Sequence, residues 1–257
     1  MPAPFLVAQI SDPHIGGDWG SARPSADPVT CFTRALDAVL SMPDRPDVLL
    51  ITGDLVEHGT DEEYEVVHRL LAAAPVPVHV LPGNHDLREQ MRAAFGLPGD
   101  AAAPIQYSAD LGPMRLVTLD TIIPGRAGGE LDAARLTWLD AELALAPDQP
   151  TLLAMHHPPA RTGIAPWDAI GLDGGSLAAV EEIVERHPQV QRIVAGHIHQ
   201  PLISTLAGRA VLTIPSTYVQ ARVDFTSSEI ELGGGVPGFG IHALVDGRLA
   251  SYLHLLG

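Results

Sequence analysis

Short apolar runs recur along the chain, and five of them end directly in aspartate, asparagine or histidine side chains. Runs of about five apolar or β-branched residues flanked by turn residues are typical of buried strands. In a layered α/β fold, the loops beyond the carboxyl ends of strands converge on one crevice. We therefore expect side chains that are distant in sequence to meet there. The five polar segments are "ISDPH" (10–14), "ITGDLVEHG" (51–59), "LPGNHD" (81–86), "AMHHPP" (154–159) and "AGHIH" (195–199).

Segments with helical spacing separate several of the apolar runs, and this alternation predicts helices layered on sheets. With 257 residues, of which 46% are hydrophobic, the chain can bury a sizeable core, so we expect one domain over residues 1–257. Glycines cluster in 223–238, which we expect to form a loop or hairpin used in oligomerisation. The expected strands are 5–10, 47–52, 76–81, 115–120, 151–156, 192–196, 210–215 and 240–245, and the expected helices are 31–42, 61–74, 132–146 and 174–188.

The net charge of −16 argues against nucleic acid or an anionic membrane surface as a partner, because both require clusters of Lys and Arg. A single cysteine, Cys31, excludes an intramolecular disulfide and fits a reducing compartment. The amino-terminal residues resemble a strand rather than a signal peptide, and no uninterrupted apolar stretch approaches about 20 residues. We therefore expect a cytoplasmic protein with a small-molecule substrate and no membrane or nucleic-acid partner.

Each polar segment alone has an ordinary structural explanation. Gly83 and Asn84 tolerate a positive φ and Pro82 favours a turn, and an aspartate after a strand is often a helix cap. Five such segments at five strand ends are improbable as independent accidents. Histidine and carboxylate ligands without thiolates suit Zn, Fe, Mn or Co, and they are too many for one ion. The pattern therefore predicts a metal site.

The order of these motifs, D-x-H, G-D, G-N-H-D, H and G-H-x-H, resembles the calcineurin-like metallophosphoesterase superfamily. Flanking segments such as "GDLVEHGTDEEY" and "AGHIHQP" are similar to those of class III cyclic-nucleotide phosphodiesterases and their glycerophosphodiesterase relatives. The resemblance covers about residues 5 to 245. It implies a four-layer α/β/β/α sandwich of two mixed sheets flanked by helices. Pro13 and Tyr218 depart from the residues common in such relatives, Thr and Cys respectively.

The resemblance also implies two transition-metal ions bound by seven residues. Asp54 would bridge the two ions and set their separation. A water activated by the ions would then attack the phosphate as hydroxide. Asp12, His14 and His199 would bind the first ion, and Asn84, His156 and His197 would bind the second.

Other polar residues near the motifs receive different assignments. His85 would contact the phosphate or protonate the departing alkoxide, although a role in orienting neighbouring groups stays open. Asp86 would fix its own loop or a ligand histidine, and His157 would support a ligand rather than act as one. Trp167 is a candidate for the wall of the substrate pocket, and Tyr218 alters that wall.

The favoured substrate is 3′,5′-cyclic AMP or a related cyclic nucleotide. A broad-specificity glycerophosphodiesterase or organophosphate diesterase is the main alternative, because the same seven ligands would serve it. A phosphomonoesterase and a non-catalytic metal-binding scaffold are weaker alternatives, and the second conflicts with the complete ligand set. The net charge opposes a nuclease. Relatives of this kind commonly form homodimers or larger homo-oligomers.

Overall fold

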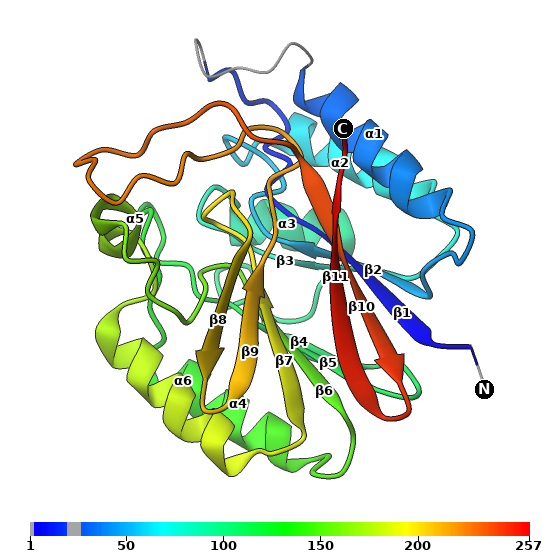
Figure 1. Cartoon of the computed structure of the whole chain (residues 1–257), viewed down its shortest axis with the longest axis vertical. Helices are drawn as coiled ribbons and strands as arrows, with labels where there is room; N and C mark the ends of the chain where they lie inside the picture. Colours follow the sequence, from blue (N-terminus) through cyan, green and yellow to red (C-terminus); the bar gives the residue numbers. More distant parts are fainter. Residues whose placement is uncertain (1–2, 20–26) are drawn as a thin grey trace.

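The computed structural model describes residues 3–19 and 27–257, which form two mixed β-sheets packed face to face (Figure 1). The first sheet has the order β11-β10-β1-β2-β3 and the second the order β4-β5-β6-β7-β9-β8. The strands are β1 (Phe5–Ile10), β2 (Val48–Thr52), β3 (Val78–Leu81), β4 (Tyr107–Asp110), β5 (Arg115–Leu119), β6 (Thr151–Met155), β7 (Val190–Ala195), β8 (Leu202–Leu206), β9 (Arg209–Thr213), β10 (Gly238–Val245) and β11 (Arg248–Leu255).

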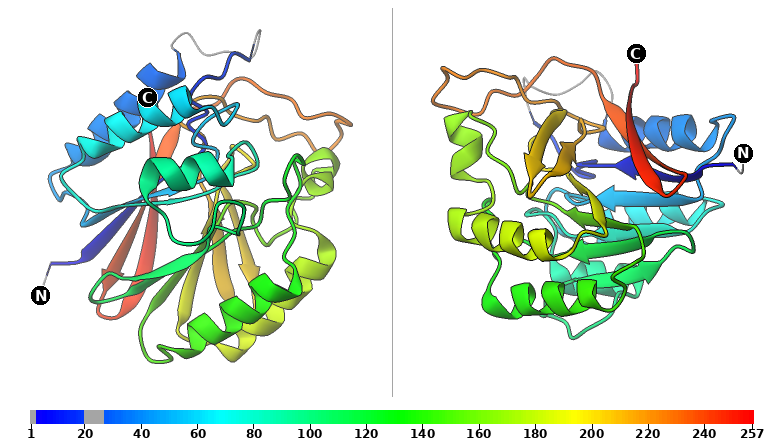
Figure 2. Two further views of the ribbon diagram at one scale, coloured as in Figure 1. Left: turned by 180° about the vertical axis from the view of Figure 1, so that it is seen from behind. Right: turned by 60° about the horizontal axis from the view of Figure 1, so that its bottom comes forward.

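Helices cover the outer face of each sheet, as the views in Figure 2 show. Each long helix begins at an Asp or Thr whose side chain accepts a hydrogen bond from the first turn, with the exception of α3. The helices on the first sheet are α1 (Pro28–Leu40), α2 (Asp61–Ala72) and α3 (Arg88–Phe95), and those on the second are α4 (Ala133–Ala144), α5 (Ala165–Ala169) and α6 (Gly174–Arg186).

Alternate residues of the strands point into different apolar layers. In β1, Leu6 and Ala8 face the helices α1 and α2, whereas Val7 faces the second sheet and packs in the layer between the sheets. A third apolar layer joins the second sheet to α4 and α6. The predicted four-layer α/β/β/α sandwich is therefore confirmed.

The sequence pattern located the buried strands and missed the peripheral ones. The unpredicted strands β4, β8 and β11 each form an antiparallel hairpin with the next or preceding strand and have many exposed or half-buried residues. Their pairing depends on the neighbouring strand rather than on apolar content. The helices α3, with eight residues, and α5, with five, were missed for a similar reason, since each has few buried residues.

The segment between β9 and β10 extends over α5 as a long irregular excursion (Figure 1). A single bridge between Ala221 and Leu232 gives it a hairpin-like form, and β10 begins at Gly238, the last residue of the predicted loop. None of the helices among residues 3–19 and 27–257 has the length and apolar composition needed to cross a membrane.

Candidate metal centre

The five polar segments meet at the carboxyl ends of the parallel strands, and their backbone there is unusual. Among residues 3–19 and 27–257, seven non-glycine residues have a positive φ, and five of these are predicted metal ligands. The left-handed region costs free energy for residues with a Cβ atom, and such strain clusters at functional sites. The sharp turns aim the side chains into the crevice. The five ligands are Asp12, His14, Asp54, His197 and His199, with φ between 45° and 73°.

The first group of predicted ligands is compact and buried. The Nε2 atoms of His14 and His199 lie 3.1 Å apart. The His14 Nε2 atom is 3.7 Å from Asp54 Oδ2, and the His199 Nε2 atom is 3.6 Å from Asp12 Oδ1. Asp12 and His14 follow β1, Asp54 follows β2 and His199 follows β7. Together these four residues could hold one ion.

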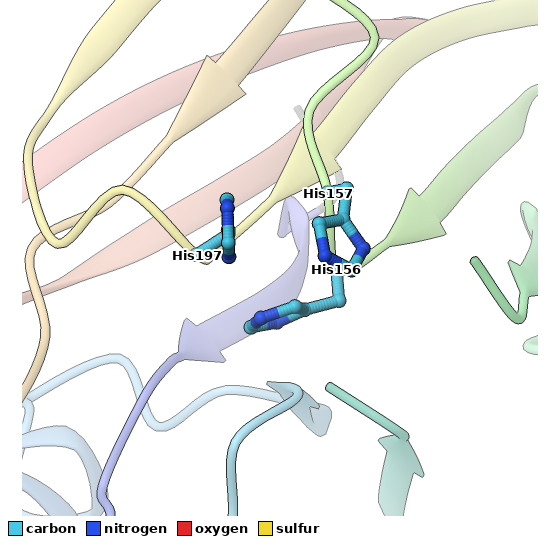
Figure 3. A group of neighbouring side chains, drawn as sticks. All are labelled: His156, His157 and His197. Carbon is cyan, nitrogen blue, oxygen red and sulfur yellow. The ribbon is translucent and has the colours of Figure 1, made fainter. Parts of the chain in front are cut away.

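The second group lies against the first and shares Asp54. The His156 Nε2 atom is 3.3 Å from Asp54 Oδ2. Asn84 Oδ1 lies 3.2 Å from His156 Nε2 and 3.1 Å from His197 Nδ1. Figure 3 shows His156 on the loop after β6 and His197 on the loop after β7, with their side chains in the space between the two loops. The structure thus brings all seven predicted ligands together.

Every histidine of these two groups has its outer ring nitrogen against an oxygen atom. His14 Nδ1 lies 2.8 Å from the Glu57 carboxylate. The other three donate to backbone carbonyls: His156 Nδ1 to Thr52 at 2.9 Å, His197 Nε2 to Ile170 at 3.0 Å and His199 Nδ1 to Val219 at 2.8 Å. These hydrogen bonds fix the tautomers and leave the inner nitrogens as lone-pair donors, an arrangement common around metal-ligating histidines.

The inner atoms of the site are therefore almost all acceptors, and they face one another. The lone pairs of His14 and His199 approach to 3.1 Å, and the buried Asp12 Oδ2 atom has no hydrogen-bond partner. Crowded acceptors without donors repel one another unless a cation lies between them. The donor set of imidazole nitrogens, carboxylates and one amide oxygen fits divalent transition-metal ions.

Glycines allow the loops to approach this closely. A Cβ atom on Gly83 would lie 2.2 Å from Asp54 Oδ1, and one on Gly196 would lie 2.7 Å from Asp12 Oδ2. Gly53 has a φ of +92°, and its Cβ atom would lie 2.4 Å from His156 Nδ1. Any side chain at these positions would displace a predicted ligand.

The carboxylates make the site attractive to positive charge. Burial alone lowers the pKa of His156, but the Asp54 carboxylate beside it raises the pKa to about 9. Burial opposes ionisation of Asp54, yet the neighbouring histidines hold the pKa of its carboxyl well below the ordinary value. By contrast, burial lowers the pKa of His199 to about 4 and that of His197 well below its usual range. The negative charge of the Asp54 carboxylate is therefore what attracts a cation to the site.

The last three residues of the motif "LPGNHD" have three different roles. Asn84 points into the second group, while His85 lies at its edge with a side chain that is 31% exposed. His85 Nδ1 donates to the Glu57 carbonyl oxygen at 3.0 Å, so its Nε2 atom is left for a ligand. The Asp86 carboxylate accepts from Gly83 N, Leu55 N and the Tyr64 hydroxyl, so it fixes the loop rather than a ligand histidine.

His157 is close to the second group but both of its ring nitrogens are engaged elsewhere. Nε2 donates to the Ala127 carbonyl at 2.9 Å, and Nδ1 accepts from the Thr121 hydroxyl at 2.8 Å. Burial and the neighbouring His156 lower the pKa of His157 to about 3. The His157 ring lies beside those of His156 and His197, as Figure 3 shows. Its two nitrogens are engaged by Thr121 and Ala127, so neither is left as a ligand.

Aromatic side chains surround the histidines. The buried Trp167 ring is 5.6 Å from that of His197, and the buried Tyr218 hydroxyl is 3.3 Å from the Gly17 carbonyl oxygen. Two neighbours were not predicted from the sequence: Glu57, which holds His14, and Trp19, whose indole stacks on His199 at 5.5 Å. Both follow ligand motifs within five residues, which is the only signal that the sequence offers for them.

The comparison with protein families agrees with this geometry. The model of the calcineurin-like phosphoesterases matches residues 5–201. The chain belongs to this family. The phosphoesterase family uses a centre of two metal ions, and the two groups of candidate ligands correspond to it in composition.

Two curated relatives in the family resemble the chain over nearly its whole length. A glycerophosphodiester phosphodiesterase, GpdQ of Enterobacter lignolyticus, is 30% identical over 256 residues, which cover 98% of this chain and 91% of the relative. The 3′,5′-cyclic adenosine monophosphate phosphodiesterase CpdA of Escherichia coli is 29% identical over 252 residues, with coverages of 97% and 89%. Both relatives are named as phosphodiesterases.

Solved structures of other phosphoesterases share the fold. A dimetal phosphatase from Danio rerio superposes with a TM-score of 0.67 at 17% identity, covering 99% of this chain and all of that one. A purple acid phosphatase from yellow lupin gives 0.70 at 13% identity, covering 98% of this chain and 54% of that one. At these identities the likeness concerns the fold alone.

Proposed function

We propose that the protein is a dimetal-dependent phosphodiesterase that hydrolyses a small phosphodiester. The observation that carries the proposal is the pair of buried ligand groups that share Asp54 and direct acceptor atoms toward one another. Asp12, His14 and His199 would hold one ion, and Asn84, His156 and His197 would hold the other. When bound, two such ions lower the pKa of a coordinated water and draw charge from the phosphate.

The ligand types suit an anionic substrate in an acidic protein. Only Asp12 and Asp54 bring negative charge into the two groups, because the other five ligands are neutral imidazoles and one amide. A local positive centre therefore persists in a chain of net charge −16. A singly charged phosphodiester is attracted to it over short distances, since the surrounding walls have a low dielectric constant.

His85 is the proposed acid for the leaving group. Its Nδ1–H is held by the Glu57 carbonyl, and its ring packs edge-on against His14 with centroids 4.8 Å apart. Nε2 is directed away from this bond and can carry a proton to the departing alkoxide oxygen, or donate to a phosphate oxygen. We expect His85→Ala to lower kcat by about 10²-fold with the metal content retained; loss of metal would instead make His85 a ligand.

Two substrate classes follow from the relatives. A 3′,5′-cyclic nucleotide is the first, as in the named activity of CpdA, and a glycerophosphodiester is the second, as in that of GpdQ. The metals proposed for the site are Fe, Mn, Zn or Co, in accord with the nitrogen and oxygen ligands.

The decisive experiment compares ester classes with Mn-loaded protein. Bis(p-nitrophenyl) phosphate should be hydrolysed faster than the p-nitrophenyl monoester, and the opposite order would make the protein a phosphomonoesterase. Rates for 3′,5′-cyclic AMP, 2′,3′-cyclic AMP and glycerophosphocholine then rank the substrate classes. No turnover of any diester by protein carrying two ions per chain would refute the proposed function.

The proposal also covers the organisation of the chain. Residues 1–257 would act as one domain, since β10 pairs with β1 in the first sheet and β11 pairs with β10. The protein would work in the cytoplasm as a homodimer or larger homo-oligomer, with the exposed 223–238 segment as a contact. Light scattering of the full chain and of a variant with 226–235 shortened would test this contact.

A further inference from the structure

A pocket of about 290 Å³ opens directly beside the proposed metal centre. Asn84, whose Oδ1 atom faces His156 and His197, is one of the residues that line it, so the pocket adjoins the second ligand group. Its other walls come from the start of α3 and from the loop after β5, and most of its lining is apolar. The residues that shape it are Asn84, Leu87, Arg88, Ile122, Ile123 and Pro124.

Leu87, which lines this pocket, occupies a position at which helices usually have a polar side chain. It is the N-cap residue of α3, and its side chain makes no cap hydrogen bond. The four other long helices begin at Asp27, Thr60, Asp132 and Asp173, each with a side chain that accepts from the first turn. A leucine N-cap is destabilising relative to Asn or Ser, and this leucine is also 46% exposed. One side of the Leu87 side chain lies against Gly59, and the backbone N–H of Leu87 donates to the Tyr64 hydroxyl at 3.0 Å. The exposed part lines the pocket, and residues that break a local rule are expected at functional sites.

The charges around the pocket disfavour a charged occupant. The Arg88 guanidinium donates to both Asp120 carboxylate oxygens at 2.8 and 3.0 Å and to the Ile122 carbonyl at 3.0 Å. It is therefore neutralised, and among the residues that the structure describes none of the other pocket-lining side chains is cationic. Glu89, exposed on the first turn of α3, adds a negative charge at the rim. A second anionic group on the substrate would be repelled.

Apolar walls also disfavour a polyol, because its hydroxyl groups would lose water without gaining hydrogen bonds. A flat apolar group buries its faces against Leu87 and Ile123 at no such cost. We propose that this pocket binds one ester group of the phosphodiester and selects a planar, largely apolar group such as an aryl ring. The inference rests on the proposed phosphodiesterase function and specifies the substrate class of that site.

The test measures binding rather than turnover. Phenylphosphonate and methylphosphonate carry the same anionic head and differ in the group that would enter the pocket. Calorimetry on the Mn-loaded protein should show tighter binding of phenylphosphonate. Leu87→Asn should reduce this preference about fivefold, because a half-exposed leucine gives up roughly half of its contact with the ring. Leu145→Asn, at a leucine that is 72% exposed outside the pocket, should keep the preference of the parent.

A second readout separates selection of a ligand from damage to the fold. Leu87→Asn should raise the melting temperature by about 2–4 °C, because Asn caps α3. Ile123→Thr removes apolar surface from the opposite wall and should lower the phenyl preference as well. Equal preference in the parent and in both pocket variants, or no phenyl preference in the parent, would overturn the inference. Absence of diester turnover with the preference intact would refute the proposed function and leave the pocket as a ligand site.

Discussion

The two halves of the proposed metal centre share Asp54 but support their histidines in different ways. In the first half, His14 is held by the Glu57 carboxylate and His199 by the Val219 carbonyl. In the second half both histidines, His156 and His197, donate to backbone carbonyls, those of Thr52 and Ile170. The first half contains a second carboxylate, Asp12, at the position where the second half has the Asn84 amide.

This difference sets the charge of each half. Burial alone lowers the pKa of His14, but the hydrogen bond to Glu57 and the charges of Asp54 and Asp12 raise it. Each half also contains a histidine whose pKa is lowered by burial, His199 to about 4 in the first half and His197 well below the ordinary value in the second. The halves therefore differ chiefly in the carboxylate of Asp12. Carboxylates increase the electrostatic attraction for a cation in a low-dielectric site. We expect the first half to bind its ion more tightly and the second half to exchange its ion more readily.

The largest effect should come from removing what the two halves share. Asp54→Ala deletes the carboxylate that lies 3.7 Å from His14 Nε2 and 3.3 Å from His156 Nε2, so it removes the group that joins the two halves. We expect diester turnover to fall roughly 10³-fold, which corresponds to the several kcal/mol that a metal centre supplies. The checks are the rate with bis(p-nitrophenyl) phosphate and the metal content by mass spectrometry. Turnover at the parent rate would refute the assignment of Asp54.

The interaction that orients His14 in the first half can be weakened by a single substitution. Glu57→Gln keeps the shape but removes the charge that faces His14 Nδ1. Loss of such an outer partner costs about 10–100-fold in metal affinity, and here the loss should affect only one of the two ions. Titration with Mn²⁺ measures both affinities, and Glu185→Gln, exposed on α6, is the matched control. Equal weakening of both ions would mean that the halves are not independent.

The difference in the number of carboxylates between the two halves can also be removed. Asn84→Asp gives the second half a carboxylate, so the combined charge of two divalent ions with their carboxylate ligands falls from about +2 to about +1. We expect slower extraction of metal by a chelator and a KM for bis(p-nitrophenyl) phosphate that is roughly tenfold higher, because the anion is attracted less. Faster extraction would contradict the electrostatic account of the two halves.

A buried histidine outside the centre shows how burial changes the pKa when no carboxylate is hydrogen-bonded to the ring. His242 Nε2 lies 3.0 Å from Gln9 Oε1 and Nδ1 lies 2.8 Å from the Ser251 hydroxyl, and burial lowers its pKa to about 3. Its unfolded pKa is about 6.5, so the unfolded chain binds this proton first. Stability from this residue is complete above pH 6.5 and is lost as the pH falls toward 3.

Between pH 7.0 and 5.5, His242 should reduce the free energy of unfolding by about 1 kcal/mol. Urea titrations of the metal-free parent and of His242→Gln at both pH values measure this, and the variant should lack that part of the acid sensitivity. An identical pH dependence in the two proteins would show that His242 is protonated in the folded state.

The sequence by itself determined the buried strands and the gathering of polar side chains at their ends, because apolar runs mark strands and the loops beyond the carboxyl ends of strands converge. The four-layer architecture and the set of seven candidate ligands came from the resemblance of the motifs to the phosphoesterase family. The φ values of Asp12 and His197 and the tight packing at Gly83 explain why these short motifs tolerate little variation in geometry.

Only the tertiary structure decided which residues support the ligands and shape the pocket. His14 and His199 are 185 positions apart in sequence and 3.1 Å apart in space, and the partners of their outer nitrogens, Glu57 and Val219, carry no motif. Leu87 and Ile123 line the same pocket although they are far apart in sequence. Such contacts depend on the packing of whole layers, which no local pattern encodes.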